Sequence, residues 1–104
     1  MTAITPSEMK IILNILQKHV RDCEVLAFGS RYKLTHTNTS DLDLAVKGKE
    51  KLPMSTISLL KEDFMESDIP YKVDVTDYHA VSDAFKEIIN AGFELIYSEG
   101  SSPP

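Results

Sequence analysis

The chain has 104 residues, and its 11 Lys and Arg against 16 Asp and Glu leave a formal net charge of −5. With 42% hydrophobic and 26% charged residues, it has the composition of one small globular domain rather than of a disordered chain. No apolar run is long enough to span a membrane, and the acidic balance argues against direct nucleic-acid binding, which relies on clustered basic residues.

The first elements have clear local signals. Residues 5–8 (TPSE) fit a capping box with proline at the first helical position, and apolar residues at helical spacing follow as far as residue 20. Residues 24–28 (EVLAF) predict a short buried strand that ends at a Gly-Ser pair. Residues 31–40 are polar and rich in threonine, so they predict a loop, with one helical turn at its start.

Two later segments alternate in the manner of strands. In residues 41–47 (DLDLAVK), Leu42, Leu44 and Val46 would face one way and Asp41, Asp43 and Ala45 the other. Residues 71–76 (YKVDVT) repeat the pattern, with two valines opposite polar neighbours. A short final strand is expected over residues 93–97.

Two helices are expected between and after these strands. Residues 55–67 predict a helix that directs Ile57, Leu60, Phe64 and Met65 inward, and Met54 is also expected to pack. Residues 82–91 predict a helix with Phe85, Ile88 and Ile89 in the core and Gly92 as its C-cap. The alternation of helices and strands predicts an α/β (α+β) fold, a mixed sheet with helices packed on it. Residues 1–97 would form one domain, and residues 98–104 (SEGSSPP) have the composition of a disordered tail.

The acidic residues of the two alternating strands are the candidates for chemistry. Asp41 and Asp43 project from the same face of one strand, and Asp74 stands between two valines on another. Aspartate is depleted in strands, and such violations tend to mark functional sites. Three carboxylates at one place repel each other unless a divalent cation such as Mg²⁺ binds them together with substrate phosphates. Two such ions could support an in-line phosphoryl displacement. The alternative is a solvated edge strand with protective charges.

Gly29 and Ser30 supply the other half of the pattern. A glycine after a strand lets a phosphate approach the backbone, and the serine offers a hydroxyl. The run GSRYKLTHTNTSDLDLAV, followed by YKVDVTDY, resembles the Gly-Ser-x10-Asp-x-Asp signature and later strand carboxylate of the polymerase-beta-like nucleotidyltransferase superfamily. The short chain is most similar to the minimal nucleotidyltransferases, which form complexes with helical HEPN-domain partners and act as antitoxins by adding AMP to a tyrosine of the toxin.

The resemblance implies a role for each matching residue. Gly29 and Ser30 would hold the triphosphate of ATP or another nucleotide, and Arg31 would approach its phosphates. Asp41 and Asp43 would bind two Mg²⁺ ions. Asp74 would complete the catalytic metal site and help to activate the acceptor hydroxyl. The chain departs from the pattern at Leu34, where many relatives have glycine, and this puts the loop's turn and its nucleotide contacts in question.

Other polar residues have weaker claims. His36 and Tyr32 lie in the expected nucleotide loop and could contact a phosphate or a base, whereas His19 and His79 are expected on the surface. Asp77 suits a turn better than a ligand site. Cys23 is the only cysteine, so a disulfide framework within the chain and a CxxC site are excluded.

Three functions compete. The first is an Mg²⁺-dependent transferase of AMP from ATP to a hydroxyl of a HEPN-type partner. The second is a catalytically silent module of the same fold that neutralises its partner by contact alone. The third is a polymerase fragment, against which the missing basic stripe argues. Residues 1–10 show neither the basic start nor the apolar run of a secretory signal, so a cytoplasmic location is expected.

Overall fold

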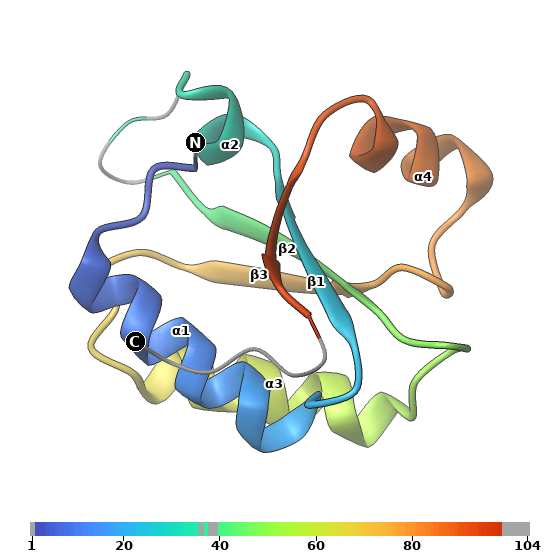
Figure 1. Cartoon of the computed structure of the whole chain (residues 1–104), viewed down its shortest axis with the longest axis horizontal. Coiled ribbons are helices and arrows are strands. Elements are labelled where there is room, and N and C mark those ends of the chain that lie inside the picture. Colours follow the sequence, from blue (N-terminus) through green and yellow to red (C-terminus); the bar gives the residue numbers. More distant parts are fainter. Residues whose placement is uncertain (1, 36, 38–39, 99–104) are drawn as a thin grey trace.

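The computed structural model describes residues 2–35, 37 and 40–98. A mixed sheet of order β3-β2-β1-β4 forms its centre, with α1 and α3 side by side on one face and α4 on the other (Figure 1). The elements are α1 (Pro6–His19), β1 (Glu24–Phe28), α2 (Ser30–Lys33), β2 (Leu42–Lys47), α3 (Met54–Glu66), β3 (Val73–Asp77), α4 (Asp83–Asn90) and β4 (Glu94–Tyr97). The predicted fold class and order of elements are confirmed. The expected tail lies, apart from Ser98, outside the described residues.

The sheet mixes both kinds of strand pairing. β1 runs antiparallel to β2 and to β4, whereas β2 and β3 are parallel. A parallel pair needs a crossover connection, and α3 provides it between β2 and β3. This crossover makes β3 an edge strand next to β2, which places the two acidic strands side by side.

The start of α1 confirms the predicted capping box. The Glu8 backbone N–H donates to Thr5 Oγ1 at 3.2 Å, and the Thr5 N–H donates to Glu8 Oε1 at 3.0 Å. The helix then buries Ile12, Leu13 and Leu16 against the sheet and α3. Burial of three such side chains contributes several kcal/mol to folding, more than the capping box of about 1 kcal/mol.

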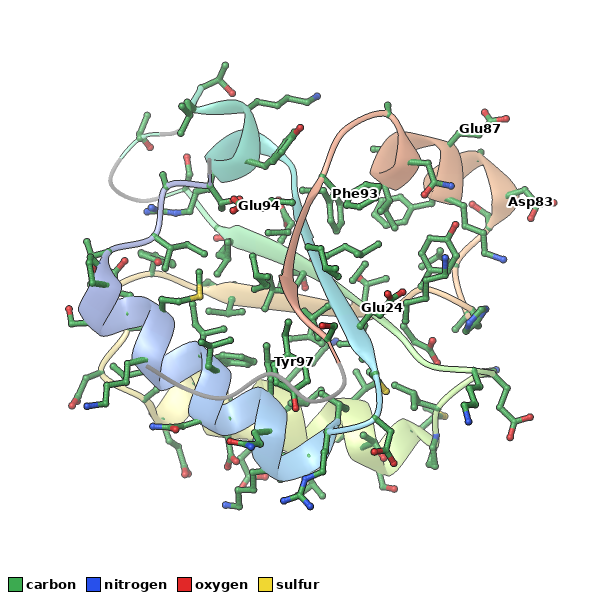
Figure 2. All side chains as sticks on the ribbon, in the orientation of Figure 1. Glu24, Asp83, Glu87, Phe93, Glu94 and Tyr97 are labelled. Atoms are coloured by element: carbon green, nitrogen blue, oxygen red, sulfur yellow. The ribbon has the colours of Figure 1, made fainter. Side chains whose placement is uncertain are left out.

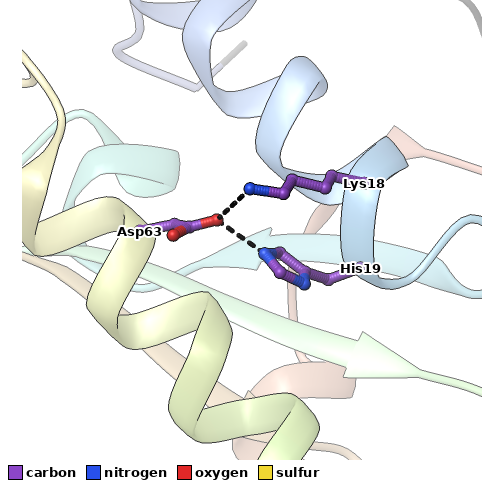
Figure 3. Close-up of polar contacts among 3 residues, drawn as sticks. All are labelled: Lys18, His19 and Asp63. Atoms are coloured by element: carbon purple, nitrogen blue, oxygen red, sulfur yellow. Dashed lines mark hydrogen bonds and ion pairs between the residues drawn. The ribbon is translucent and has the colours of Figure 1, made fainter.

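A polar contact joins α1 to α3 beside this apolar packing (Figure 3). His19 Nε2 lies 2.6 Å from Asp63 Oδ2, and Lys18 Nζ lies 3.6 Å from the same oxygen. The hydrogen bond with His19, followed by the charge of Lys18, lowers the pKa of the Asp63 carboxyl.

His79, like His19, has a hydrogen-bond partner: its Nε2 lies 2.7 Å from the Gly48 carbonyl oxygen. Both histidines are half-buried, so the expectation that they lie on the surface is wrong.

The alternation of β2 divides its side chains between two cores, as predicted. Leu42, Leu44 and Val46 lie in the larger core with α1 and α3. Ala45 lies in a smaller core with Leu26, Phe28 and Ile89, on the face that α4 covers. Because alternate side chains point to opposite faces, Asp43 shares the face of Ala45.

Several expectations for the helices are wrong in detail. Met65 is 80% exposed, Met54 is 83% exposed and Ile88 is 58% exposed. Leu60 and Phe64 define the buried line of α3, and Met65 lies about 100° around the helix from it. Ile88 is displaced in the same way from the inward Ile89. The C-cap of α4 is Ala91, one residue before the predicted Gly92.

The β3 bounds also differ from the expectation. The strand covers Val73–Asp77, so it starts two residues later and ends one residue later than predicted. The described part of the chain contains no helix that is both long and apolar enough to cross a membrane.

Candidate active site

Asp43 and Asp74 are direct neighbours across the parallel β2–β3 ladder. Asp43 also faces Phe28 across the antiparallel β1–β2 ladder, so it sits in the middle of the sheet. Adjacent strands lie about 4.8 Å apart, and both residues use the face opposite the larger core. The strand order therefore brings together two of the three aspartates that the sequence singled out. Asp41 lies at the exposed entry to β2, on the same alternation as Asp43.

The surroundings of Asp43 disfavour its charged form. Burial raises the pKa of Asp43, and the nearby carboxylates of Asp74 and Asp41 raise it further. Within residues 2–35, 37 and 40–98, no hydrogen bond or ion pair neutralises this cluster. A cluster of like charges without a cation is what a divalent ion would stabilise.

The donor set fits Mg²⁺ as a partly open site. In the described part of the chain, no three Asp, Glu, His or Cys side chains are gathered closely enough to enclose a metal ion by themselves. Mg²⁺ commonly takes one or two carboxylates and completes its octahedron with water and substrate phosphates. Asp43 and Asp74, with Asp41 at their edge, match that kind of site better than a closed cage.

Gly29 connects the end of β1 to the same cluster. Its φ of +82° lies in the region that favours glycine, and a Cβ added there would collide with the Asp43 carboxylate. The residue therefore has to be glycine for two independent reasons. Ser30 follows as the first residue of the short helix α2. The spacing of the Gly-Ser pair pointed to a shared site, and this contact is the geometric counterpart of that spacing.

Arg31 is turned into the protein. Its side chain is buried, its Nε–H donates to the Ser40 carbonyl oxygen at 2.9 Å, and its Nη1 donates to the Ala3 carbonyl oxygen at 3.1 Å. The guanidinium also stacks on the ring of Tyr71 at 3.6 Å from the centroid. These contacts hold the residue immediately before Asp41. The phosphate contact expected of Arg31 stays a prediction, and the described contacts give it a positioning role.

The partners of Arg31 come from distant parts of the chain and have no local signal in the sequence. Tyr71 donates its hydroxyl to Glu8 Oε1 at 2.8 Å, which joins the start of α1 to the start of β3. The N-terminal segment is held on the other side, because the Thr2 N–H donates to Glu94 Oε1 at 2.6 Å. Figure 2 shows Glu94 beside this segment. No local sequence signal pairs residues so far apart in the chain.

The other residues that the sequence singled out have different surroundings. Leu34 adopts the left-handed conformation with φ of 61°, the turn that glycine would make without strain. Asp77 is the buried last residue of β3, and its carboxylate caps the following turn, since it accepts from the N–H groups of Leu52 and His79. Tyr32 lies against Gly92, after α4. His36 lies outside the described residues.

Cys23 is a core residue, as expected. It is buried in the larger core, and burial, followed by the charges of Asp22 and Asp77, raises the pKa of its thiol. A thiol that stays protonated is a poor nucleophile. Catalytic use of Cys23 is therefore disfavoured by its surroundings.

Comparison with known proteins decides the family. Residues 10–101 match the family model described as polymerase beta, nucleotidyltransferase. The chain belongs to the polymerase beta nucleotidyltransferase family. It is also 43% identical over 93 residues to the probable protein adenylyltransferase MntA of Haemophilus influenzae, covering 89% of this chain and 82% of that protein.

Solved structures of toxin–antitoxin complexes contain chains with a similar fold. A toxin–antitoxin complex with AMP-PNP gives a TM-score of 0.72 at 22% identity, covering 86% of this chain and 73% of the other. A tri-AMPylated Shewanella oneidensis HEPN toxin in complex with MNT antitoxin gives a TM-score of 0.68 at 17% identity, and the match covers 90% of this chain and 73% of the other. At these identities the likeness supports the nucleotidyltransferase fold.

Proposed function

We propose that this nucleotidyltransferase transfers AMP from ATP to a hydroxyl of a partner protein, a tyrosine of a HEPN-type toxin, and so acts as a cytoplasmic antitoxin. Residues 1–97 would act as one minimal nucleotidyltransferase domain. The observation that carries the proposal is the Asp43–Asp74 pair, with Gly29 against the Asp43 carboxylate. The 43% identity to a probable protein adenylyltransferase supports the choice of AMP and of a protein acceptor.

The reaction assigns a task to each residue of the site. Gly29 and Ser30 would hold the triphosphate at the end of β1, and Asp41, Asp43 and Asp74 would bind Mg²⁺. The bound metal would supply positive charge to the phosphates and to the acceptor oxygen. Asp74, at the β3 edge, would orient the acceptor hydroxyl and help to take its proton.

The bond changes are those of an in-line displacement. The acceptor oxygen forms a bond to the α-phosphorus of ATP, and the bond from that phosphorus to the oxygen bridging to the β-phosphate breaks. Pyrophosphate leaves with the electron pair of that bond. The chain's residues act by positioning both oxygens and by neutralising charge, because no covalent intermediate on the protein is required.

The intact mass of the acceptor tests the proposal. A HEPN-type protein that forms a complex with this chain would be incubated with ATP, Mg²⁺ and either the wild type or Asp43→Asn. We expect the acceptor to gain mass in steps of one adenylate with the wild type only, and fragmentation to place the addition on a tyrosine. Parallel reactions with CTP, GTP and UTP would establish the base preference.

The opposite outcome would support the binding module. A stable complex that neutralises the toxin equally well with both proteins, and no mass gain with any nucleotide, would overturn the transferase proposal. Omission of Mg²⁺, with EDTA present, separates the metal requirement from the identity of the acceptor.

A further inference from the structure

A pocket of about 410 Å³ opens between the second half of α3 and the start of β3. Its apolar wall includes Phe64, Met65 and Ile69, and Asp74 is also among its lining residues. We call it the α3–β3 pocket. Asp74 of the edge strand β3 links the pocket to the acidic cluster, although its side chain uses the face of the sheet opposite α3, and the phosphate-binding candidates at the end of β1 lie elsewhere. Nothing in the proposed handling of ATP requires an apolar cavity here.

The strand order places the pocket and the phosphate-binding candidates on different sides of Asp43. Asp43 lies on the central strand, with the end of β1 and Gly29 on one side and Asp74 of β3 on the other. A nucleotide held at Gly29 and a second substrate at the pocket would therefore approach Asp43 from opposite sides. In-line displacement is compatible with that arrangement, because the acceptor oxygen and the leaving oxygen must lie on opposite sides of the phosphorus.

The edge position of β3 makes the pocket accessible. In the sheet formed by the described residues, β3 pairs with β2 alone, so its outer edge has no strand neighbour. A segment of another protein that lies along this edge can contact α3 with one part and reach the carboxylate face with another. The two sides of the sheet are otherwise separated by the sheet itself.

The surface chemistry indicates what binds. Met65 is 80% exposed at the pocket, which leaves a flexible apolar side chain in water that a partner could cover. Lys61 and Lys72 are exposed pocket residues in a chain whose net charge is −5. This combination suits a segment with an apolar anchor and acidic neighbours.

We propose that the α3–β3 pocket binds the acceptor segment of the protein that receives the nucleotide. An apolar side chain of that segment packs against Met65 and Phe64, its acidic residues pair with Lys61 and Lys72, and its hydroxyl is presented to Asp74. This inference rests on the proposed transferase function and adds the acceptor's binding site to it.

The two exposed methionines of α3 give a matched test. Met65→Gln changes the pocket, whereas Met54→Gln changes an equally exposed methionine at the other end of the same helix, outside the pocket. Glutamine is chosen because it keeps a similar length and helix propensity. Lys61→Glu tests the charge, with Lys10→Glu on α1 as the control for the same change in net charge.

The readout is the rate of adenylate transfer at varied concentrations of the HEPN-type acceptor protein and of ATP. We expect Met65→Gln and Lys61→Glu each to raise the KM for the acceptor about tenfold. The KM for ATP and the kcat at saturating acceptor should stay at wild-type values, and the two controls should behave like the wild type. Thermal unfolding confirms that every variant is folded.

Each outcome has a separate meaning. Wild-type transfer with an unchanged acceptor KM in both pocket variants would overturn the acceptor site and leave the transferase function standing. An equal rise in the controls would also overturn it, because the effect would then not belong to the pocket. No transfer by the wild type would overturn the proposed function, and the acceptor site with it.

Discussion

Arg31 stacks its guanidinium on the ring of Tyr71, with Cζ 3.6 Å from the ring centroid. The same guanidinium donates to the carbonyl oxygen of Ser40, the residue before Asp41. The Tyr71 hydroxyl donates to Glu8, whose carboxylate also accepts from the N-cap of α1. The stack therefore joins the start of α1, both ends of the loop after α2 and the entry to the acidic strand β2.

Replacing the ring should weaken both the fold and the metal site. Tyr71→Leu loses a stacking contact of about 0.5–2 kcal/mol and a hydrogen bond to a charged group of about 1.5–3 kcal/mol, so we expect a total loss of about 2–5 kcal/mol. Tyr71→Phe is the control, because it keeps the ring under Arg31. Urea denaturation measures both variants. Equal losses of stability would show that the stack with Arg31 contributes nothing.

The same pair tests the positioning role of Arg31. If the stack holds Ser40 and Asp41, then Arg31→Ala and Tyr71→Leu should each weaken Mg²⁺ binding about 10–100-fold, as loss of a supporting contact does at other metal sites. Mg²⁺ titration followed by thermal stability measures the affinity. A defect in Arg31→Ala alone, seen as a higher KM for ATP, would favour direct phosphate contact instead.

Leu34→Gly should stabilise the protein. Leucine in the left-handed conformation costs about 1–2 kcal/mol, and glycine regains part of this after its larger loss of entropy on folding, so the expected gain is about 0.5–1 kcal/mol. Leu34→Ala keeps a Cβ and should show no gain. The side chain is 58% exposed, so little packing is lost in either variant. If chemical denaturation gives Leu34→Ala the same stability as Leu34→Gly, the strain argument is contradicted.

Gly29→Ala should damage stability and the candidate site together. Its Cβ would enter the space of the Asp43 carboxylate at a φ that disfavours alanine, so we expect a loss of more than about 1 kcal/mol and a large fall in transfer rate. Gly48→Ala is the control: its φ lies outside the left-handed region, and an added Cβ would lie 3.3 Å from Cys23 Sγ, a contact that a small shift relieves. Thermal unfolding and the adenylate transfer assay report the two effects. A Gly29→Ala protein with wild-type activity would rule out the close packing of β1 against Asp43.

Asp43→Asn should separate stability from activity. The raised pKa of Asp43 means that the folded protein holds this proton more tightly than the unfolded chain does. Its contribution to stability is therefore complete below the usual Asp pKa and is lost as the pH rises through the raised value. At neutral pH, without Mg²⁺, we expect Asp43→Asn to be more stable than the wild type, with a flatter dependence on pH across the acidic range.

The activity of the same variant should fall by at least about 100-fold, because metal binding contributes several kcal/mol to such transition states. Mg²⁺ should raise the melting temperature of the wild type and have little effect on Asp43→Asn. The exposed Asp68→Asn is the control for removing one negative charge. If the control gains as much stability as Asp43→Asn at neutral pH, the cluster is not the source of the effect.

Predictions from the sequence were most accurate where the signals are local. The capping box at residues 5–8, the strand over residues 24–28 and the two faces of β2 match the structure because each depends on neighbours within one turn or one alternation. Errors arose on helix faces. Met65 and Ile88 are apolar and lie next to buried positions, but only packing decides how wide the buried stripe of a helix is.

The features of the candidate site also fall into two groups, those set by the local sequence and those set by the tertiary structure. Sequence alone determined that Asp41 and Asp43 share a strand face and that a Gly-Ser pair precedes them, since both follow from backbone period and spacing. Tertiary structure alone decided that Asp74 is the register partner of Asp43 and that Gly29 packs against the same carboxylate. Strand order and register are set by packing between distant segments, and no local pattern encodes them. The inward turn of Arg31 onto Tyr71 has the same origin, because a buried guanidinium is oriented by partners that the chain brings together only on folding.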